Sequence, residues 1–363
     1  MSSPTPATNY TFASDNTAGI CPEAWGALAE ANSGTVASYG DDLWSKEATR
    51  LFCERFETEV KVHFVFNGTA ANSLALAACC RSSHTRIFCH TVSHVDTDEC
   101  AAPEFFTGGA KLASLPGPNA KLLPDELERA LHGGAGVHYP RPGALSLTQS
   151  TEWGTVYQQQ EIRALTEVAR RTNLPVHMDG ARFANAVAAM ARELPTNARP
   201  ESLLADVTWR SGVDVLCLGG TKNGMLTTEA VIFFNHDLAK EFDYRVKQGG
   251  QLASKMRFAA AQWIGMLRDG AWLSHAAHAN AMARLLAEQF KTVPGAKVIL
   301  PTEVNAVLVE LESQVHAALE QKGWAFYPFI GERGYRLMCS WDTTPKDVEA
   351  LISDLRKPAR SFG

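Results

Sequence analysis

The sequence of 363 residues contains no apolar run that approaches the roughly 18 residues of a membrane-spanning helix. Its N-terminal stretch carries neither a basic start nor an apolar core, which predicts that no signal peptide is present. Basic side chains do not dominate, since 34 Lys and Arg stand against 39 Asp and Glu and the formal net charge is −5. This balance argues against a protein that binds nucleic acid or an anionic membrane through a broad basic surface.

None of the eight cysteines forms a CxxC pair, so the spacing typical of zinc ribbons and thioredoxins is absent. Several of them lie within apolar runs, such as Cys79 and Cys80 in LALAACC and Cys217 in VDVLCL. A free thiol in such a run behaves as a small hydrophobic side chain. We therefore expect a reducing, cytoplasmic environment, and the sequence displays no cluster of residues that would ligate a metal ion.

Short apolar runs alternate with helical patterns along most of the chain. Runs rich in β-branched and aromatic residues predict strands at 63–66, 86–89, 143–149, 174–179, 213–218 and 229–235. Helices are predicted at 46–57, 73–80, 124–131, 158–172 and 181–191. This alternation is typical of βαβ units and predicts an α/β fold with a large, mostly parallel sheet covered on both faces.

The pattern changes after about residue 250. Two long helical patterns cover 252–268 and 271–291, and apolar strands follow at 306–311 and 335–341. We therefore predict a large domain over residues 1–270 and a small C-terminal α+β domain over residues 271–363.

The segment NGTAAN at 67–72 joins a predicted strand to a predicted helix. The free N–H groups and positive dipole end of a helix N-terminus bind phosphate well, and Gly68 and Thr69 would supply them. An ordinary strand-to-helix turn, with Thr69 as the N-cap, is the alternative. The segment is not a P-loop, because no GK[ST] follows it.

A second polar position ends the predicted strand 174–179, in the segment HMDGARFANA. Because ligands of parallel α/β sheets bind at the carboxyl ends of strands, Asp179 is a candidate partner for a cationic group. Arg182, three residues later, is a candidate for a bidentate ion pair with a carboxylate. The alternative is a helix-capping Asp followed by a surface Arg.

A third candidate is Lys222, which lies in LGGTKNGML directly after the predicted strand 213–218. The glycines around it allow a close approach of backbone or ligand. A lysine in a partly dry site can lose its proton and attack a carbonyl group. The alternative is a solvent-exposed turn lysine.

Together, these three features match the needs of pyridoxal 5′-phosphate. Its phosphate needs a helix N-terminus, its pyridine nitrogen needs an anion, and its aldehyde needs a lysine. A nicotinamide cofactor would instead need G-x-G-x-x-G after a strand, whereas HGGAG at 132–136 follows a predicted helix. The residues therefore predict a pyridoxal phosphate enzyme.

The chain also resembles the threonine aldolase family of fold-type-I pyridoxal phosphate enzymes, and within it the low-specificity L-threonine aldolases and L-phenylserine aldolases. The matching segments, in family order, are FASDNTAGICPEAW at 12–25, YGDD at 39–42, NGTAAN at 67–72, SHVDTDECAAPEFF at 93–106, TQSTEWGTVY at 148–157, HMDGARFANA at 177–186, GGTKNGM at 219–225 and SKMRFAAAQ at 254–262. The resemblance implies the aspartate aminotransferase fold, with a seven-stranded, mostly parallel sheet. It also implies a homotetramer in which paired subunits share active sites.

The resemblance implies a role for each candidate residue. Lys222 forms the Schiff base, Asp179 pairs with the pyridine nitrogen, and His94 stacks on the ring as the favoured base or water-holder, with His90 as the alternative. The cofactor is bound by these residues and by Gly68, Thr69, Arg182, Lys247 and Lys255. The substrate is bound by Ser14, Tyr39, Glu152, Arg182 and Arg336, while Trp153, Phe105 and Phe106 are candidates for the aldehyde pocket. Tyr39, Lys247 and Lys255 would reach the site of a neighbouring subunit.

One segment departs from the family, because TQSTEWG at 148–154 lacks the histidine that another branch carries there. Glu152 or a bound water is the candidate substitute, so the identity of the base stays open. We expect reversible cleavage of L-3-hydroxy-α-amino acids to glycine and an aldehyde. The alternatives are a β-eliminating lyase or an aminotransferase on the same fold, and a non-catalytic pyridoxal phosphate regulator, for which no basic arm is present.

Overall fold

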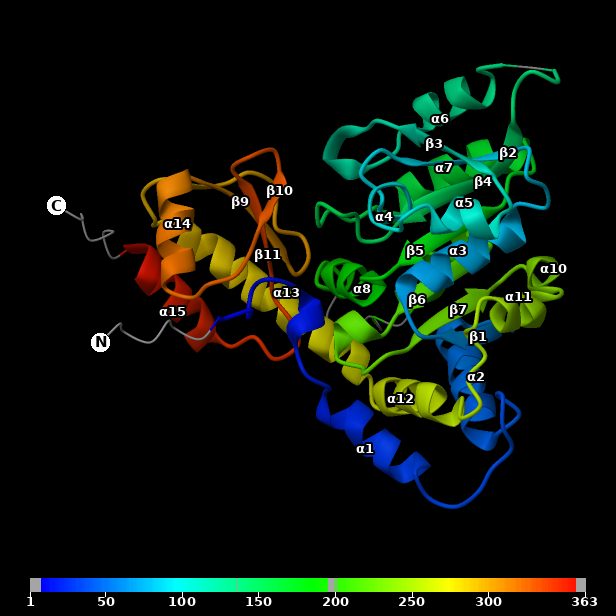
Figure 1. Cartoon of the computed structure of the whole chain (residues 1–363), viewed down its shortest axis with the longest axis horizontal. Coiled ribbons are helices and arrows are strands. Elements are labelled where there is room, and N and C mark those ends of the chain that lie inside the picture. Colours follow the sequence, from blue (N-terminus) through cyan, green and yellow to red (C-terminus); the bar gives the residue numbers. More distant parts are fainter. Residues whose placement is uncertain (1–7, 135, 195–199, 201, 357–363) are drawn as a thin grey trace.

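The computed structural model describes residues 8–134, 136–194, 200 and 202–356. It contains a seven-stranded sheet in the order β1-β7-β6-β5-β4-β2-β3 and a four-stranded sheet in the order β10-β11-β9-β8. The larger sheet and its helices form one side of the molecule, and the smaller sheet forms the other side with α14 and α15 (Figure 1). The long helix α13, Ala271–Phe290, runs between them.

The larger sheet is parallel except for β7, which runs antiparallel to both of its neighbours. The carboxyl ends of the other strands therefore meet at one edge, which is where ligands bind in such sheets. The strands are β1 Lys61–Val65, β2 Thr85–His90, β3 Lys111–Leu115, β4 Arg141–Thr148, β5 Val176–Gly180, β6 Val215–Gly219 and β7 Glu229–Phe233.

Side chains of this sheet alternate between two apolar cores, one on each face. In β6, Val215 and Cys217 pack with α3, α10 and α11, whereas Leu216 and Leu218 pack with α7, α8 and α12. Coverage on both faces explains why these strands are continuous apolar runs. The helices before α13 are η1 Asp15–Thr17, α1 Pro22–Ala31, α2 Leu43–Phe56, α3 Gly68–Cys79, α4 His94–Thr97, α5 Ala102–Phe106, η2 Pro118–Ala120, α6 Pro124–Leu131, α7 Gln159–Arg171, α8 Phe183–Ala191, α9 Ser202–Asp206, η3 Trp209–Ser211, η4 Thr221–Asn223, α10 His236–Ala239, α11 Phe242–Gln248 and α12 Arg257–Arg268.

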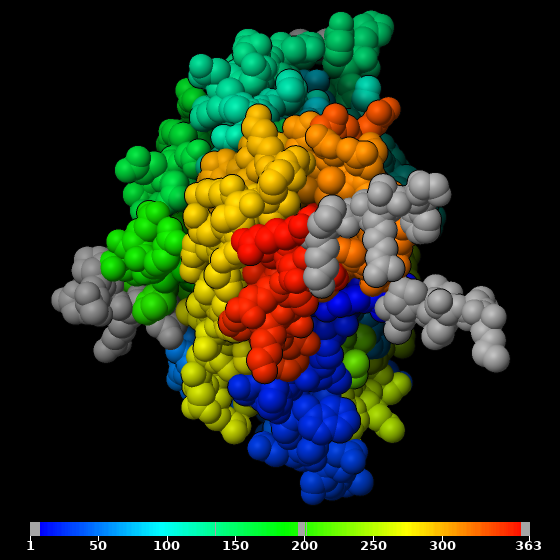
Figure 2. All heavy atoms as spheres, turned by 90° about the vertical axis from the view of Figure 1, so that its left-hand side faces the viewer, coloured from blue at the N-terminus to red at the C-terminus, as the bar shows by residue number. Residues whose placement is uncertain are grey.

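The smaller sheet has its own core against α13, α14 and α15. Figure 2 shows α15, in red, lying along α13, in yellow. Phe12 joins this core, and its ring centre lies 5.8 Å from that of Trp324, so the N-terminal segment packs on the small sheet before it enters the large one. The remaining elements are β8 Ala296–Val298, β9 Ala306–Leu311, α14 Ser313–Gln321, β10 Pro328–Ile330, β11 Gly334–Met338 and α15 Pro345–Arg356.

The structure confirms the α/β class, the seven-stranded sheet and all of the predicted strands, with shifted ends. Strand β3 was not predicted, because it lies at the edge of the sheet and its exposed or half-buried side chains leave no apolar run. The helix predicted at 252–268 is wrong at its start, since α12 begins at Arg257 and the carbonyl of Ser254 instead accepts the N–H of Tyr39 at 3.1 Å. The domain division at residue 270 stays a prediction.

Among the described residues, no helix has the length and apolarity needed to span a bilayer.

Candidate active site

The carboxyl edge of the large sheet collects candidate residues from five strands. Thr69 follows β1, His94 follows β2 and Glu152 follows β4. Asp179 lies near the end of β5, and Lys222 follows β6. Because these strands are parallel, side chains that are far apart in the sequence converge from one direction on a common site.

Helix α3 begins with a turn that can bind an anion. Asn67 is the N-cap, and its side-chain oxygen accepts a hydrogen bond from the N–H of Ala70 at 2.8 Å. The alternative in which Thr69 caps this helix is wrong, because Thr69 lies within the first turn. The N–H groups of Gly68 and Thr69 have no acceptor in the described part of the chain. They therefore remain available to a phosphate group.

Asp179 is a buried carboxylate that is held in one orientation. Its Oδ1 accepts a hydrogen bond from the N–H of Ala181 at 2.9 Å, and its Oδ2 accepts one from Nδ2 of Asn72 at 3.0 Å. Asn72 belongs to α3, so the helix that offers the phosphate site also fixes this carboxylate. An oriented carboxylate in a buried position is suited to pair with a protonated ring nitrogen.

Glycine at the end of β6 allows the turn that carries Lys222 to lie close to β5. A Cβ atom at Gly219 would lie only 2.3 Å from the carbonyl oxygen of Ala181, so any larger residue would push the two strand ends apart. The end of β6, which leads into the Lys222 turn, therefore lies against the segment that follows Asp179. This close packing explains why glycine occupies position 219.

Hydrogen bonds fix the turn around Lys222 on three sides. They run from the N–H of Gly220 to Oε2 of Glu229 (2.6 Å), from Nδ2 of Asn223 to the carbonyl of Trp272 (2.7 Å), and from the N–H of Cys21 to the carbonyl of Gly224 (2.8 Å). The half-buried amine of Lys222 itself has no hydrogen bond or ion pair with the described residues. A fixed turn with an unpaired amine is what a lysine nucleophile needs.

Glu229 is buried directly behind this turn. Burial raises the pKa of its carboxyl to about 7, although Thr221, the N–H of Gly220 and the charge of Lys222 act in the opposite direction. The native protein therefore keeps a proton between pH 4.5 and about pH 7 that the unfolded chain has lost. As a result, Glu229 makes the native state less stable as the pH rises through this window, by up to about 3 kcal/mol.

We expect Glu229→Gln to weaken this pH dependence, because glutamine keeps an acceptor for Gly220 but cannot ionise. The melting temperature should fall less between about pH 5 and about pH 8 in this variant than in the natural protein, by several degrees. Glu349→Gln, at an exposed position of α15, is the matched control. An equal fall in the Glu229 variant and the natural protein would show that Glu229 does not titrate in this window.

His94 follows β2 and is oriented by a buried acid. Its Nδ1 donates a hydrogen bond to Oε1 of Glu99 at 2.9 Å. This bond raises the pKa of His94 against the effect of its partial burial, and the charges of Asp179 and Glu152 add to the increase. Nε2 has no partner in the described part of the chain, so it is the ring nitrogen available to a ligand.

His90, the alternative to His94, is engaged on both ring nitrogens. Its Nε2 donates to the carbonyl of Gly117 at 3.1 Å, and its Nδ1 accepts from the N–H of Val92 at 3.2 Å. Burial lowers its pKa. These backbone contacts favour a structural role for His90 and leave His94 as the better candidate.

Arg182 forms a buried, bidentate ion pair. Its Nε and Nη2 donate to the two carboxylate oxygens of Asp15 at 2.7 and 2.9 Å. Burial opposes both shifts, yet the pairing lowers the pKa of Asp15 and raises that of Arg182. Ser14 lies beside this pair in the sequence, is half-buried, and accepts the N–H of Asn16 at 3.2 Å. The N-terminal segment therefore holds one edge of the Arg182 guanidinium, the edge formed by Nε and Nη2.

Arg336 reaches toward the same region from the small sheet. It lies in β11, its Nη1 is 3.4 Å from Oε2 of Glu152, and its guanidinium lies 3.8 Å from the centre of the Phe329 ring. Burial and the nearby charge of Arg182 lower its pKa. The buried guanidinium of Arg182 and the half-buried guanidinium of Arg336 repel each other and favour an anion between or beside them, and a carboxylate fits their planar shape.

Tyr39, Lys247 and Lys255 gather on an exposed surface instead. Tyr39 is 48% exposed, and the amine of Lys247 lies 5.2 Å from its ring centre. Lys255 follows Ser254, whose carbonyl accepts the N–H of Tyr39. In the described residues, no hydrogen bond links this surface to Lys222 or Asp179. Within one chain, these three residues are therefore exposed and outside the hydrogen bonds that the structure describes around Lys222 and Asp179.

The structure adds four polar residues that the sequence did not single out: Asp15, Asn72, Glu99 and Glu229. All four are buried. Nδ2 of Asn72 donates to both Asp179 and Glu99, at 3.0 and 2.8 Å, so it joins two acids that are distant in the sequence. Polar residues inside matching motifs, such as Asn72 in NGTAAN, were the available signal. Their partners could be identified only in three dimensions.

The chain is similar to known proteins over most of its length. A family model described as beta-eliminating lyase matches residues 11–314. The low specificity L-threonine aldolase of Pseudomonas aeruginosa is 52% identical over 345 residues, which cover 95% of this chain and 96% of the relative. That of Pseudomonas sp. is 49% identical with the same coverage. The solved structure of Leishmania major threonine aldolase has a TM-score of 0.86 and 28% identity, and the match covers 96% of this chain and 98% of that one. The chain belongs to the beta-eliminating lyase family, and within it to the threonine aldolases.

Proposed function

We propose that the protein cleaves L-3-hydroxy-α-amino acids to glycine and an aldehyde, with pyridoxal phosphate as cofactor. The observation that carries this proposal is the convergence of an unpaired lysine, an oriented buried carboxylate and a free helix N-terminus at one sheet edge. The relatives named L-threonine aldolase, at about half identity over nearly the full chain, support the reaction type.

The residues of the site fit this cofactor. The N–H groups of Gly68 and Thr69 would bind its phosphate, Asp179 would pair with the pyridine nitrogen, and Lys222 would supply the amine that its aldehyde requires. When bound, the cofactor accepts the electron pair released from the Cα–Cβ bond. His94, whose Nδ1 donates to Glu99, would stack on the cofactor ring, and Glu99 would fix its tautomer.

Arginine residues orient the amino acid. Arg182 and Arg336 bind the substrate carboxylate, and the Ser14 hydroxyl adds a hydrogen bond. A carboxylate fixed in this way sets the direction of the bond that breaks, which is the main contribution of positioning to the rate. Asp15 supports Arg182 through the bidentate pair and keeps its guanidinium from rotating.

His94 is the proposed base that removes the proton of the 3-hydroxyl group. Glu152, the alternative, lies 3.4 Å from Arg336, and this ion pair favours a role in holding that arginine. His94 acts in its neutral form, so the rate rises with pH as the imidazolium loses its proton. Because Glu99 raises the pKa of His94, it also sets where this rise occurs.

We therefore expect Glu99→Gln to shift the rising limb of the kcat/KM profile to lower pH. The reason is that the amide no longer stabilises the imidazolium form of His94. Glu104→Gln, on the nearby helix α5, is the control and should leave this limb in place. A limb that does not move in the Glu99 variant would exclude His94 as the base and would turn attention to Glu152 or a bound water.

We also propose that the site accepts substrates whose aldehyde products differ in size, so that phenylserine is cleaved as well as threonine. Trp153, Phe105 and Phe106 remain the candidate pocket residues, and Phe105 is 78% exposed, which fits a pocket completed by another surface. Aldehyde release from L-threonine and L-threo-phenylserine, with pyridoxal phosphate added, tests this. Release of acetaldehyde and benzaldehyde with equal glycine is expected, and no aldehyde from either substrate would contradict the proposed reaction.

A β-eliminating lyase is the second candidate, because the matching family model carries that description. It would use the same lysine, carboxylate and phosphate site. Such an enzyme would form ammonia and pyruvate or another keto acid from a β-substituted amino acid, whereas an aminotransferase would form a keto acid only when a second keto acid is added to accept the amino group. A keto acid without aldehyde in the assay above would favour this reading over the aldolase.

We further propose a cytoplasmic homotetramer in which Tyr39, Lys247 and Lys255 serve the site of a paired subunit. Their exposure on one chain supports this, since an isolated subunit would leave them in solvent. Co-expression of Lys222→Ala with Tyr39→Ala subunits should then restore roughly a quarter of the activity, because some pairs contain one complete site. The absence of any restored activity, or a monomeric mass in solution, would contradict shared sites.

A further inference from the structure

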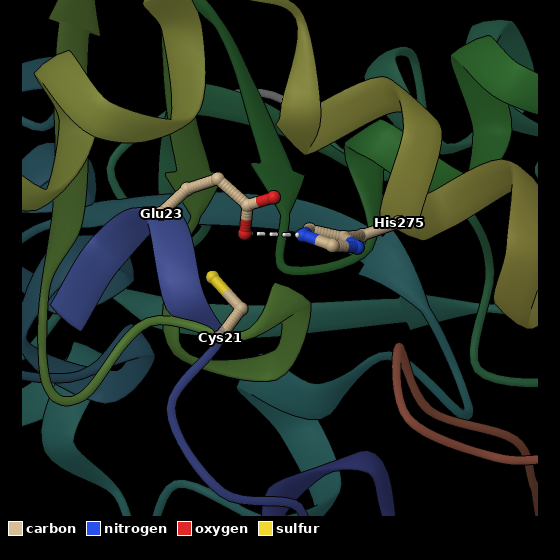
Figure 3. Close-up of side chains that lie close together, drawn as sticks. All are labelled: Cys21, Glu23 and His275. Carbon is tan, nitrogen blue, oxygen red and sulfur yellow. Dashed lines mark hydrogen bonds and ion pairs between the residues drawn. The ribbon is translucent and has the colours of Figure 1, made fainter. Parts of the chain in front are cut away.

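Three potential metal ligands from distant parts of the chain meet beside the Lys222 turn. Cys21 occupies the N-cap position of α1, Glu23 lies in its first turn, and His275 lies near the start of α13. Their ligand atoms all lie within 4.8 Å of one another, and the side chains point toward each other (Figure 3). Nε2 of His275 is 2.9 Å from Oε2 of Glu23.

The chemistry of these groups selects the kind of ion. A thiolate, an imidazole and a carboxylate are the ligands of Zn²⁺, whereas Mg²⁺ and Ca²⁺ prefer oxygen ligands alone. Sγ of Cys21 also lies 3.3 Å from Sδ of Met266, so the buried side of the cluster is rich in sulfur. Three protein ligands leave the fourth tetrahedral position to water.

The exposed fraction of the side chain increases from Cys21 to His275 to Glu23. Cys21 is fully buried, while the side chains of His275 and Glu23 are 17% and 40% exposed. An ion can therefore enter past Glu23 and reach the sulfur last. Burial raises the pKa of the Cys21 thiol to about 11, so the ion must displace a proton, which passes to solvent.

We propose that Cys21, Glu23 and His275 bind one Zn²⁺ ion per chain at a site separate from the pyridoxal phosphate site. The ion would join α1 to α13, because these helices carry its ligands. It would also lie next to the turn of Lys222, because the N–H of Cys21 donates to the carbonyl of Gly224 at 2.8 Å. Trp341 closes one side, with its ring centre 5.4 Å from that of His275 and its Nε1 bonded to the carbonyl of Gly19 at 2.9 Å. Binding therefore stiffens the support of the catalytic lysine.

Cobalt substitution tests the proposal without relying on activity. The holoenzyme, freed of metals by a chelator and dialysis, is titrated with Co²⁺, and difference spectra remove the absorption of pyridoxal phosphate. We expect one Co²⁺ per chain, with a thiolate-to-cobalt band and the intense d–d bands of four-coordinate cobalt. Zn²⁺ should displace it. The Cys21→Ser variant should lose the thiolate band, and Cys100→Ser, at an exposed thiol, should retain it.

Variants at the more exposed ligands keep the test valid if Cys21→Ser folds poorly. His275→Asn and Glu23→Gln should each weaken Co²⁺ binding at least about 10-fold. No thiolate band in the natural protein, or a band that persists in Cys21→Ser, would overturn the proposal. Unchanged Co²⁺ affinity in His275→Asn would also overturn it and would leave the cluster as an ordinary ion pair beside a buried thiol. None of these results depends on which amino acid the enzyme cleaves.

Discussion

Replacing Lys222 by alanine is expected to abolish turnover, with a loss of at least about 10⁴-fold in kcat at saturating pyridoxal phosphate. The amine is the group that would attach the cofactor, and no other lysine lies in the same turn. The fold should be unaffected, because this amine makes no hydrogen bond or ion pair with the described residues. The melting temperature of the variant without cofactor should therefore stay close to that of the natural protein without cofactor, apart from the loss of the Lys222 charge near Glu229 and Asp15.

A matched control separates this effect from a general effect of removing a lysine. Lys240→Ala removes an exposed lysine that follows α10 and pairs with Asp237 at 2.7 Å. This variant should keep full activity. Substantial turnover by the Lys222 variant, in the presence of cofactor, would mean that the site has been assigned to the wrong lysine.

Replacing Asp179 by asparagine is expected to lower kcat on the order of 10³-fold, because a neutral amide cannot keep a pyridine nitrogen protonated. Asparagine is nearly isosteric and can still accept a hydrogen bond from Ala181 or Asn72, so the local structure should persist. The cofactor should still bind through its phosphate and Lys222. A large fall in kcat with little change in bound cofactor is the expected signature.

Asp214→Asn is the control for this variant. Asp214 lies just before β6, at the amino end of the sheet, and accepts hydrogen bonds from the N–H of Val176 and from Asn235, both at 2.8 Å. Its replacement should reduce the stability of the protein but leave kcat unchanged. If Asp179→Asn keeps normal turnover, the carboxylate is a structural helix-end residue, as the alternative interpretation of the sequence held.

The order of elements was predictable because a parallel sheet with two covered faces produces continuous apolar strands. The runs that became β5 and β6 were both predicted; Asp179 lies next to the end of β5, and Lys222 follows the end of β6 by three residues. The direction of β7 was not predictable, because a hairpin partner and a parallel neighbour have the same apolar pattern. The start of α12 was placed too early, since apolar residues before Arg257 continue the pattern without belonging to the helix.

The candidate site was predictable where one segment carried both the strand end and its polar residue. Lys222 and Asp179 are of this kind. The pairing of Arg182 with Asp15 was not predictable, because 167 positions separate them and nothing local marks Asp15 as its partner. The same holds for His275 and Glu23, which are 252 positions apart, so the sequence displayed no metal-ligand spacing.

Borohydride reduction followed by peptide mapping tests the central claim most directly, namely that one sheet edge forms a pyridoxal phosphate site around Lys222. Reduction fixes the cofactor on the residue to which it is attached. We predict that the modification lies on the peptide containing Lys222, at one group per chain, and that Asp179→Asn still carries it. Modification of another lysine, or no modification of a protein saturated with pyridoxal phosphate, would contradict the account.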